Sequence, residues 1–105
     1  MAEGDVPTVV DHPQEHRFVL TQDGFVAELV YRRHGDRLVL IHTEVPSELG
    51  GRGIGGLLVR AAVDEARKGG LTIVPWCPFA RKWLHDHADA ASTVSIDWDS
   101  QPPSN

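Results

Sequence analysis

A glycine-rich stretch in the middle of the chain has the composition of a loop that binds an anion. It contains five of the ten glycines of the chain, in the run Gly50, Gly51, Arg52, Gly53, Ile54, Gly55 and Gly56. Glycine has no Cβ atom, so its backbone can adopt positive φ and approach a ligand closely. The helix that we expect next would add unpaired N–H groups and the positive end of its dipole, which favour a phosphate or pyrophosphate.

The same stretch also fits the dinucleotide fingerprint G-x-G-x-x-G, from Gly51 to Gly56. That fingerprint needs a buried strand directly before its first glycine and an acidic residue about 20 positions further on. Here residues 46–50 separate the loop from the preceding strand-like segment, and residues 71–79 contain no Asp or Glu. No Gly-Lys-Ser/Thr follows, which excludes a P-loop nucleotide hydrolase as well.

The overall composition predicts one globular domain. The chain has 105 residues and a net charge of −5, and the charge argues against general nucleic-acid binding. No apolar run reaches the roughly 20 residues that span a bilayer, and residues 1–5 are acidic where a signal peptide is basic. A single cysteine, Cys77, excludes an internal disulfide framework, so we expect a cytoplasmic protein.

Charge is unevenly distributed along the chain. Residues 52–82 carry six bases and two acids, whereas residues 1–16 and 83–105 carry acids and no bases. The basic block therefore coincides with the glycine loop and the segments after it, where a polyphosphate needs compensating charge. For Arg60, Arg67 and Lys68 a solvated helix face explains the pattern equally well.

The elements that position the loop follow an α/β order. We expect strands at residues 17–20, 25–31, 37–45, 71–74 and 93–96, with the apolar run at 38–41 making the third strand central. A helix from Ile54 should end at Gly69 and Gly70, and Pro78 fits the first turn of another. The fourth strand should run parallel to the third, because a helix crosses between them. We expect tails at residues 1–14 and 99–105 around a domain at residues 15–98.

In this order the residues resemble the small single-domain members of the acetyl-CoA-dependent N-acetyltransferase (GNAT) superfamily. Two segments carry the resemblance, residues 42–55, with His-Thr-Glu-Val-Pro before the loop, and residues 73–79, with Ile-Val-Pro-Trp-Cys-Pro-Phe. The resemblance implies a minimal acyl-CoA N-acyltransferase-like fold with a mixed α/β sheet. It also implies that acetyl-CoA contacts Thr43, Glu44, Val45, Gly50, Gly51, Arg52, Gly53, Ile54, Gly55, Gly56, Pro78 and Phe79.

The chain departs from the superfamily pattern at several positions. Three residues before Gly53 the pattern has Gln or Arg, and this chain has Gly50, so Arg52 is the neighbouring source of positive charge. After His87 the small subfamily often continues with Pro-Glu-Tyr, and here Ala88, Asp89 and Ala90 follow. Only a turn separates the first two strands, where larger acetyltransferases have helices that cover the acceptor, so we expect an open acceptor cleft.

Acetyl transfer to an amine needs a polarised carbonyl, a deprotonated amine and a proton for the departing thiolate. By resemblance, a backbone N–H near residues 43–45 polarises the thioester where the third and fourth strands splay apart. Strand alternation places His42 and Glu44 on one face and Thr43 and Val45 on the other, unless a bulge intervenes. His42 and Glu44 are the candidate bases, although a purely structural role at the strand end also fits them.

Cys77 is a candidate acid or acetylated nucleophile, because it directly precedes a helix start that would lower its pKa. A small buried hydrophobic residue is the alternative interpretation. We expect no metal site: His85 and His87 share a helix but point to different faces, and the known zinc spacings are lacking. Trp76, Phe79 and Trp83 are expected to form the core or the walls of the coenzyme pocket.

These observations predict an N-acetyltransferase that moves an acetyl group from acetyl-CoA to an amine of unknown identity, without nucleic-acid or membrane partners. The alternative is a non-catalytic module that binds or senses acyl-CoA, for which the absent tyrosine and the open cleft argue. A third hypothesis is an interaction domain whose loop binds only a phosphate or carboxylate of a partner.

Overall fold

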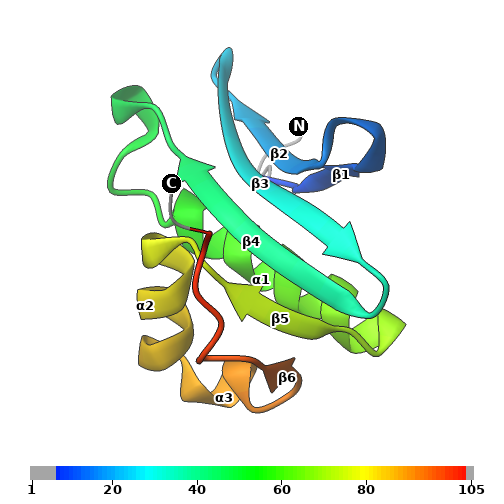
Figure 1. Cartoon of the computed structure of the whole chain (residues 1–105). Helices are drawn as coiled ribbons and strands as arrows, with labels where there is room; N and C mark the ends of the chain where they lie inside the picture. The colour runs from blue at the N-terminus through cyan, green and yellow to red at the C-terminus, as the bar shows by residue number, and fades with distance from the viewer. Residues whose placement is uncertain (1–6, 104–105) are drawn as a thin grey trace.

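Six strands form one mixed sheet in which the spatial order of the strands follows the chain (Figure 1). The computed structural model describes residues 7–103. The strands are β1 (Val10–His12), β2 (Arg17–Gln22), β3 (Phe25–His34), β4 (Arg37–Glu44), β5 (Thr72–Pro75) and β6 (Ser95–Ile96). The helices are α1 (Ile54–Gly69), α2 (Pro78–Asp86) and α3 (Ala88–Ala91), with 3-10 turns η1 (Pro13–Glu15) and η2 (Ser47–Leu49).

The direction of the strands changes in the middle of the sheet. Strands β1 to β4 are antiparallel, whereas β4, β5 and β6 run parallel to one another. Short turns are enough to join the antiparallel strands, but the parallel step from β4 to β5 needs a crossover, which α1 supplies. The predicted fold class and the predicted parallel pairing of β4 with β5 are confirmed.

A bulge in β4 sets which side chains face the core. Leu40 and His42 pair with the consecutive residues Tyr31 and Val30 of β3, so Ile41 is an extra residue in β4. Leu40 is fully buried. Without the bulge, His42 would point to the same buried face of the sheet as Leu40. The bulge resets the alternation, so that Thr43 lies opposite the buried Leu29 while His42 and Glu44 lie on the other face of the sheet.

One face of the sheet is covered by α1, which lies behind it in Figure 1 and packs against β2, β3, β4 and β5. The apolar stripe of the helix is buried there, through Leu58, Val59, Ala62, Val63 and Ala66. Gly70 ends the helix in the left-handed conformation, as expected, and its N–H donates to the carbonyl of Ala66. Helix α2 packs against α1, β4 and β5, and begins at Pro78 as expected.

The ends of the fold differ from the sequence expectation. Residues 10–12, expected to lie in an N-terminal tail, instead form β1 and pair with β2. At the other end, the amides of Asp99 and Ser100 donate to the Asp97 carboxylate, and the Trp76 indole donates to Ser100, so these residues of the expected C-terminal tail are held on the domain. Among residues 7–103, no helix is long and apolar enough to cross a bilayer.

Candidate functional site

A cleft of about 750 Å³ opens where the glycine loop meets the end of β4 and the side of α2. It lies beyond the last pair between β4 and β5, Leu40 with Pro75, where the two segments separate. Its lining residues are Thr43, Val45, Pro46, Ser47, Leu49, Gly50, Gly51, Gly53, Ile54, Gly55, Gly56, Leu57, Arg60, Phe79, Trp83 and His87. The predicted coenzyme residues are therefore brought together, apart from Glu44, Arg52 and Pro78, which do not line the cleft.

The loop takes a backbone conformation that favours glycine at two positions. Gly51 has φ of 78° and Gly53 has φ of 73°, and a Cβ atom at either position would meet no atom within 4 Å. The requirement for glycine there is therefore conformational and does not come from crowding. Gly53 is the residue that directly precedes the first turn of α1.

The first turn of α1 forms part of the cleft wall. No side chain caps this helix, whose first residues are Ile54, Gly55 and Gly56. The backbone N–H groups of a first turn have no partner within the helix, and the helix dipole adds partial positive charge there. This turn has the properties that the predicted anion site requires.

Gly55 and Gly56 serve a different purpose, because aromatic side chains of α2 occupy the space beside them. A Cβ atom on Gly55 would lie 2.6 Å from Cζ of Phe79, and one on Gly56 would lie 2.6 Å from Nε1 of Trp83. Real Cβ atoms do not approach other atoms so closely. These two glycines therefore let α2 pack directly on the start of α1, which closes one side of the cleft.

The candidate bases His42 and Glu44 lie together on the opposite face of the sheet from α1. Nε2 of His42 and Oε1 of Glu44 are 3.1 Å apart, and both side chains are more than half exposed. Neither lines the cleft. Glu28 of β3 is the cross-strand partner of Glu44, and its carboxylate accepts a hydrogen bond from Arg17 at 2.7 Å.

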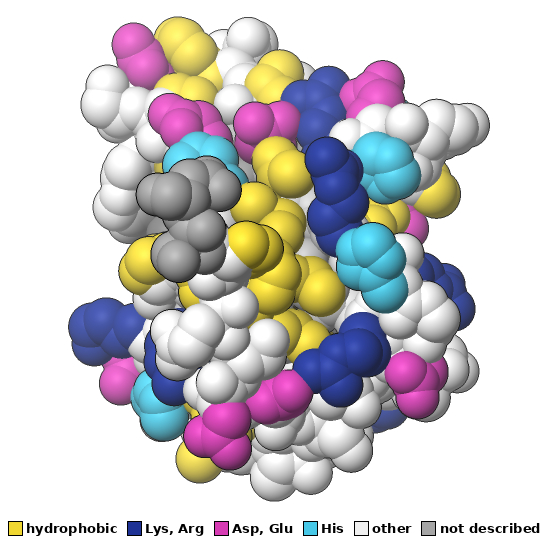
Figure 2. Space-filling view, viewed as in Figure 1, with side chains coloured by type: hydrophobic (Ala, Val, Ile, Leu, Met, Phe, Trp, Pro, Cys, Tyr) yellow, Lys and Arg dark blue, Asp and Glu magenta, His cyan; other side chains and the backbone are white. Residues whose placement is uncertain are grey.

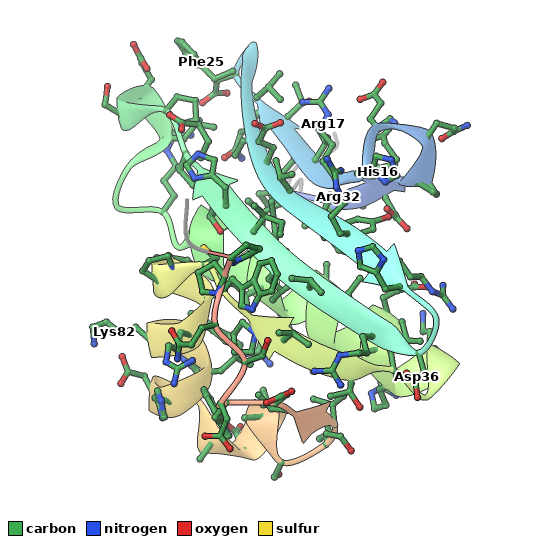
Figure 3. The ribbon with its side chains drawn as sticks, in the orientation of Figure 1. His16, Arg17, Phe25, Arg32, Asp36 and Lys82 are labelled. Carbon is green, nitrogen blue, oxygen red and sulfur yellow. The ribbon has the colours of Figure 1, made fainter. Side chains whose placement is uncertain are left out.

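Polar and apolar side chains are separated on this face. Hydrophobic side chains gather over the middle of the view in Figure 2, and a row of basic side chains and histidines lies along its right side. Figure 3 places Arg17 and Arg32 among this row, from β2 and β3, whereas Lys82 extends away from α2 on the other side. The face has no helix over β3 and β4 in Figure 1, which agrees with the expectation of an open acceptor side.

Cys77 is buried at the start of α2. Its Sγ lies 3.2 Å from Oγ1 of Thr43, and its backbone N–H donates to the carbonyl of Leu40 at 2.8 Å. Both contacts tie α2 to β4 next to the bulge. The thiol does not line the cleft, but Thr43 does, so the thiol lies one side chain behind the cleft wall.

Of the basic side chains in and after the glycine loop, some form ion pairs away from the cleft and one lines it. Arg52 forms an ion pair with Asp23 of the β2–β3 turn at 2.8 Å, and Arg67 pairs with Asp64 on its own helix. Arg60 lines the cleft, and its guanidinium lies 5.1 Å from the centre of the Trp83 ring. The positive charge expected from Arg52 is therefore supplied to the cleft by Arg60, which lies one and two-thirds turns into α1.

His87 also lines the cleft, although it was not among the predicted coenzyme residues. Its ring stacks on Trp83 with 4.0 Å between the centres, and its Nδ1 donates to the Trp83 carbonyl at 2.8 Å. Phe79, Trp83 and His87 recur at intervals of four residues, which places them along one side of a helix. This spacing is the sequence signal that could have placed His87 beside Phe79 and Trp83. Among residues 7–103, no group of three or more side chains is arranged to hold a metal ion.

The mixed sheet, the glycine loop at the start of α1 and the opening between β4 and α2 together define a GNAT-type fold. The family model described as GCN5-related N-acetyl-transferase matches residues 17–93, and the chain therefore belongs to this family.

A solved structure supports the same assignment. The chain is similar to a GCN5-like protein from Staphylococcus aureus, a candidate N-acetyltransferase studied by NMR in solution, with 28% identity and a TM-score of 0.66. The similarity covers 88% of this chain and 92% of that one. A comparison with curated proteins gave no match.

Proposed function

We propose that this chain is an acetyl-CoA-dependent N-acetyltransferase. The observation that carries the proposal is the first turn of α1, which no side chain caps and which lines a cleft of about 750 Å³. Gly51 and Gly53, both with positive φ, precede this turn and line the same cleft. The described lining of this cleft contains no carboxylate, although the chain has 15 acidic residues. A cleft with free amides and without acids suits a polyanionic ligand, and family membership makes acetyl-CoA the leading choice.

In this proposal the pyrophosphate of acetyl-CoA binds the amides of residues 51–56. The pantetheine arm then runs along Val45 and Thr43, toward the point where β4 and the chain leading into α2 separate. Phe79, which is 45% exposed beside the loop, forms an apolar wall for it. A backbone N–H near residues 43–45 donates to the thioester oxygen, as the family resemblance implies.

The amine acceptor approaches from the open face of the sheet, where His42 and Glu44 lie. Its nitrogen attacks the thioester carbon, forming the amide bond while the carbon–sulfur bond breaks. Glu44 or His42 takes the proton that the amine loses, and the thiolate of CoA takes up a proton. Cys77 is the candidate donor for that step, through Thr43, which its thiol contacts.

The direct test is calorimetric titration with acetyl-CoA, CoA and inorganic pyrophosphate, followed by thiol release with a panel of primary amines. Micromolar binding that is selective for the CoA ligands, together with amine-dependent thiol release, is the expected result. Equal affinity for pyrophosphate and CoA would instead indicate a simple anion site. No binding of either CoA ligand would overturn the proposal.

A non-catalytic acyl-CoA-binding module is the second candidate. The structural observation in its favour is that His42, Glu44 and Cys77 do not line the cleft that would hold the coenzyme. The two candidates predict the same binding isotherms and differ in turnover alone. Acetyl-CoA binding without thiol release for any amine in the panel would favour the module.

A further inference from the structure

The cleft contains one permanently charged side chain, Arg60, among its described lining residues. No carboxylate in the described part of the chain forms an ion pair with it, whereas Arg67, two turns further along α1, pairs with Asp64 at 2.8 Å. Arg60 is instead held over the Trp83 ring at 5.1 Å. A guanidinium that faces a cleft without a counter-charge has its full hydrogen-bonding capacity available to an anion.

The side chain of Trp83 supplies an independent sign of a ligand in the same place. It is 9% exposed, and its Nε1 forms no hydrogen bond within the described residues. Every fully enclosed side-chain nitrogen or oxygen among the described residues has a hydrogen-bond partner, so the unpartnered Nε1 of Trp83 must be accessible. Since Trp83 lines the cleft, we infer that this N–H faces the cleft. It lies beside Gly56, within 2.6 Å of the place that a Cβ atom would take. A donor is thus positioned next to Arg60.

His87 completes the arrangement. Its Nδ1 donates to the Trp83 carbonyl, because a carbonyl can only accept, and this fixes the imidazole against the indole. With the proton on Nδ1, Nε2 of the neutral ring is a hydrogen-bond acceptor, so His87 holds the indole in place and donates no hydrogen bond to an anion. Arg60 and Trp83 therefore form a cationic cluster with hydrogen-bond donors at the side of the cleft, separate from the amides of the loop, and His87 stacks on its indole.

We propose that this cluster binds the 3′-phosphate of coenzyme A, while the loop amides bind the pyrophosphate. The inference rests on the proposed function. Coenzyme A carries two anionic groups, a diphosphate and a phosphomonoester on the ribose, and the cleft offers two donor sets. Arg60 and the first turn of α1 line the same cleft, so one ligand can contact both. The planar fork of arginine matches a phosphomonoester.

The test compares CoA with 3′-dephospho-CoA by calorimetry on the wild type, Arg60→Gln and the control Arg67→Gln. Charge-assisted hydrogen bonds of this type are worth roughly a factor of ten, so the wild type should bind CoA roughly tenfold more tightly than dephospho-CoA. Arg60→Gln should abolish most of that preference while changing dephospho-CoA affinity less than about twofold. Arg67→Gln removes the same charge from the same helix and should leave both affinities unchanged.

Trp83→Phe provides a second variant that keeps an aromatic ring at this position and removes the N–H. It should weaken CoA more than dephospho-CoA, and it keeps the proposal testable should Arg60→Gln fold poorly. A wild type without preference for CoA, or an equal loss of both ligands in Arg60→Gln, would overturn the 3′-phosphate assignment and leave the coenzyme site standing. Failure of both ligands to bind the wild type would overturn the proposed function itself.

Discussion

At the scale of a single residue, substitutions of Gly53 test whether the loop needs a left-handed backbone conformation to bind CoA. Its φ of 73° is strained for β-branched residues, whereas Asn tolerates the left-handed region. Gly53→Val should therefore abolish CoA binding while the far-UV circular dichroism stays unchanged, and Gly53→Asn should bind within a few-fold of the wild type. Calorimetry on both variants is the measurement. Since a Cβ atom meets nothing there, an unchanged affinity in Gly53→Val would refute the loop assignment.

Glu44 tests the separation of binding from chemistry. General-base catalysis contributes about 10²–10⁴-fold, so a base at Glu44, rather than at His42, predicts that Glu44→Gln lowers kcat at least 100-fold. Affinity for acetyl-CoA should not change, because the side chain lies on the sheet face away from the cleft. Glu28→Gln is the matched control, since it removes the carboxylate directly across the strand pair. Equal losses of kcat in the two variants would indicate a general electrostatic effect and no base at Glu44.

The sequence was sufficient for some of these residues and insufficient for others. Local rules located the glycine loop, because positive φ and a helix start are properties of a short segment. Arg52 was expected to face the ligand, but it pairs with Asp23, which lies 29 residues earlier on the β2–β3 turn. No local rule brings that turn beside the loop. Arg60 was grouped with Arg67 and Lys68, and only packing on Trp83 distinguishes it.

At the scale of elements, the contact between α1 and α2 gives opposite predictions for two adjacent glycines. Alanine in a helix is normally favoured over glycine by up to about 1 kcal/mol. In Gly56→Ala the new methyl group would collide with the buried ring of Trp83, so we expect a loss of about 1–3 kcal/mol. In Gly55→Ala it would meet the far end of the exposed Phe79 ring, which can rotate outward.

Gly55→Ala should therefore unfold at the same urea concentration as the wild type or above it. Urea unfolding followed by tryptophan fluorescence measures both variants on one scale. A Gly56→Ala protein as stable as the wild type would show that the two helices do not pack as closely as described.

Strand β1 is joined to the sheet by a side-chain contact that titrates. The Tyr31 hydroxyl donates to Asp11 at 2.6 Å, and burial, followed by this carboxylate, raises the pKa of Tyr31 above its usual value. The folded state therefore holds the phenol proton more tightly than the unfolded state does. This contribution to stability is complete below about pH 10 and is lost as the pH rises above it.

The unfolding free energy of the wild type should consequently fall more steeply than that of Tyr31→Phe as the pH rises above about pH 10. Urea titrations across that range give the difference, and other basic groups cancel in the comparison. Parallel pH profiles would show that the Tyr31–Asp11 contact does not form in solution.

Most of the regular elements could be predicted from the sequence, since apolar runs, turns and helix ends have local signals. Strand β1 and helix α3, which were not predicted, lack such signals. Residues 10–12 form a strand of three residues, only one of them apolar, and pairing with β2 is what orders them. Residues 88–91 form a single helical turn that packs on α1 and α2. The bulge at Ile41 was likewise invisible, because it depends on the register with β3.

At the scale of the whole molecule, the salt dependence of CoA binding shows whether the net charge of the chain or the local charge of the cleft dominates. The chain has a net charge of −5, which would repel an anionic coenzyme, yet Arg60 and the helix start face it in the cleft. Local charge acts within the Debye length of about 10 Å at 0.1 M salt. We therefore expect CoA affinity to fall as salt is raised, with a shallower slope in Arg60→Gln. An affinity that rises with salt would show that the overall negative charge dominates.

The sequential order of the strands has a consequence for how the molecule comes into being. Each strand pairs only with the strand made just before it and the one made just after, so no segment must wait for a distant one to thread between its neighbours. The contacts among β1 to β4 close short loops, which favours rapid folding. On a ribosome, β1 to β4 could form a hairpin ladder before α1 has been synthesised. The sheet would then grow toward β6 in the direction of translation, and the coenzyme cleft would close when α2 has followed β5, before β6 has been added.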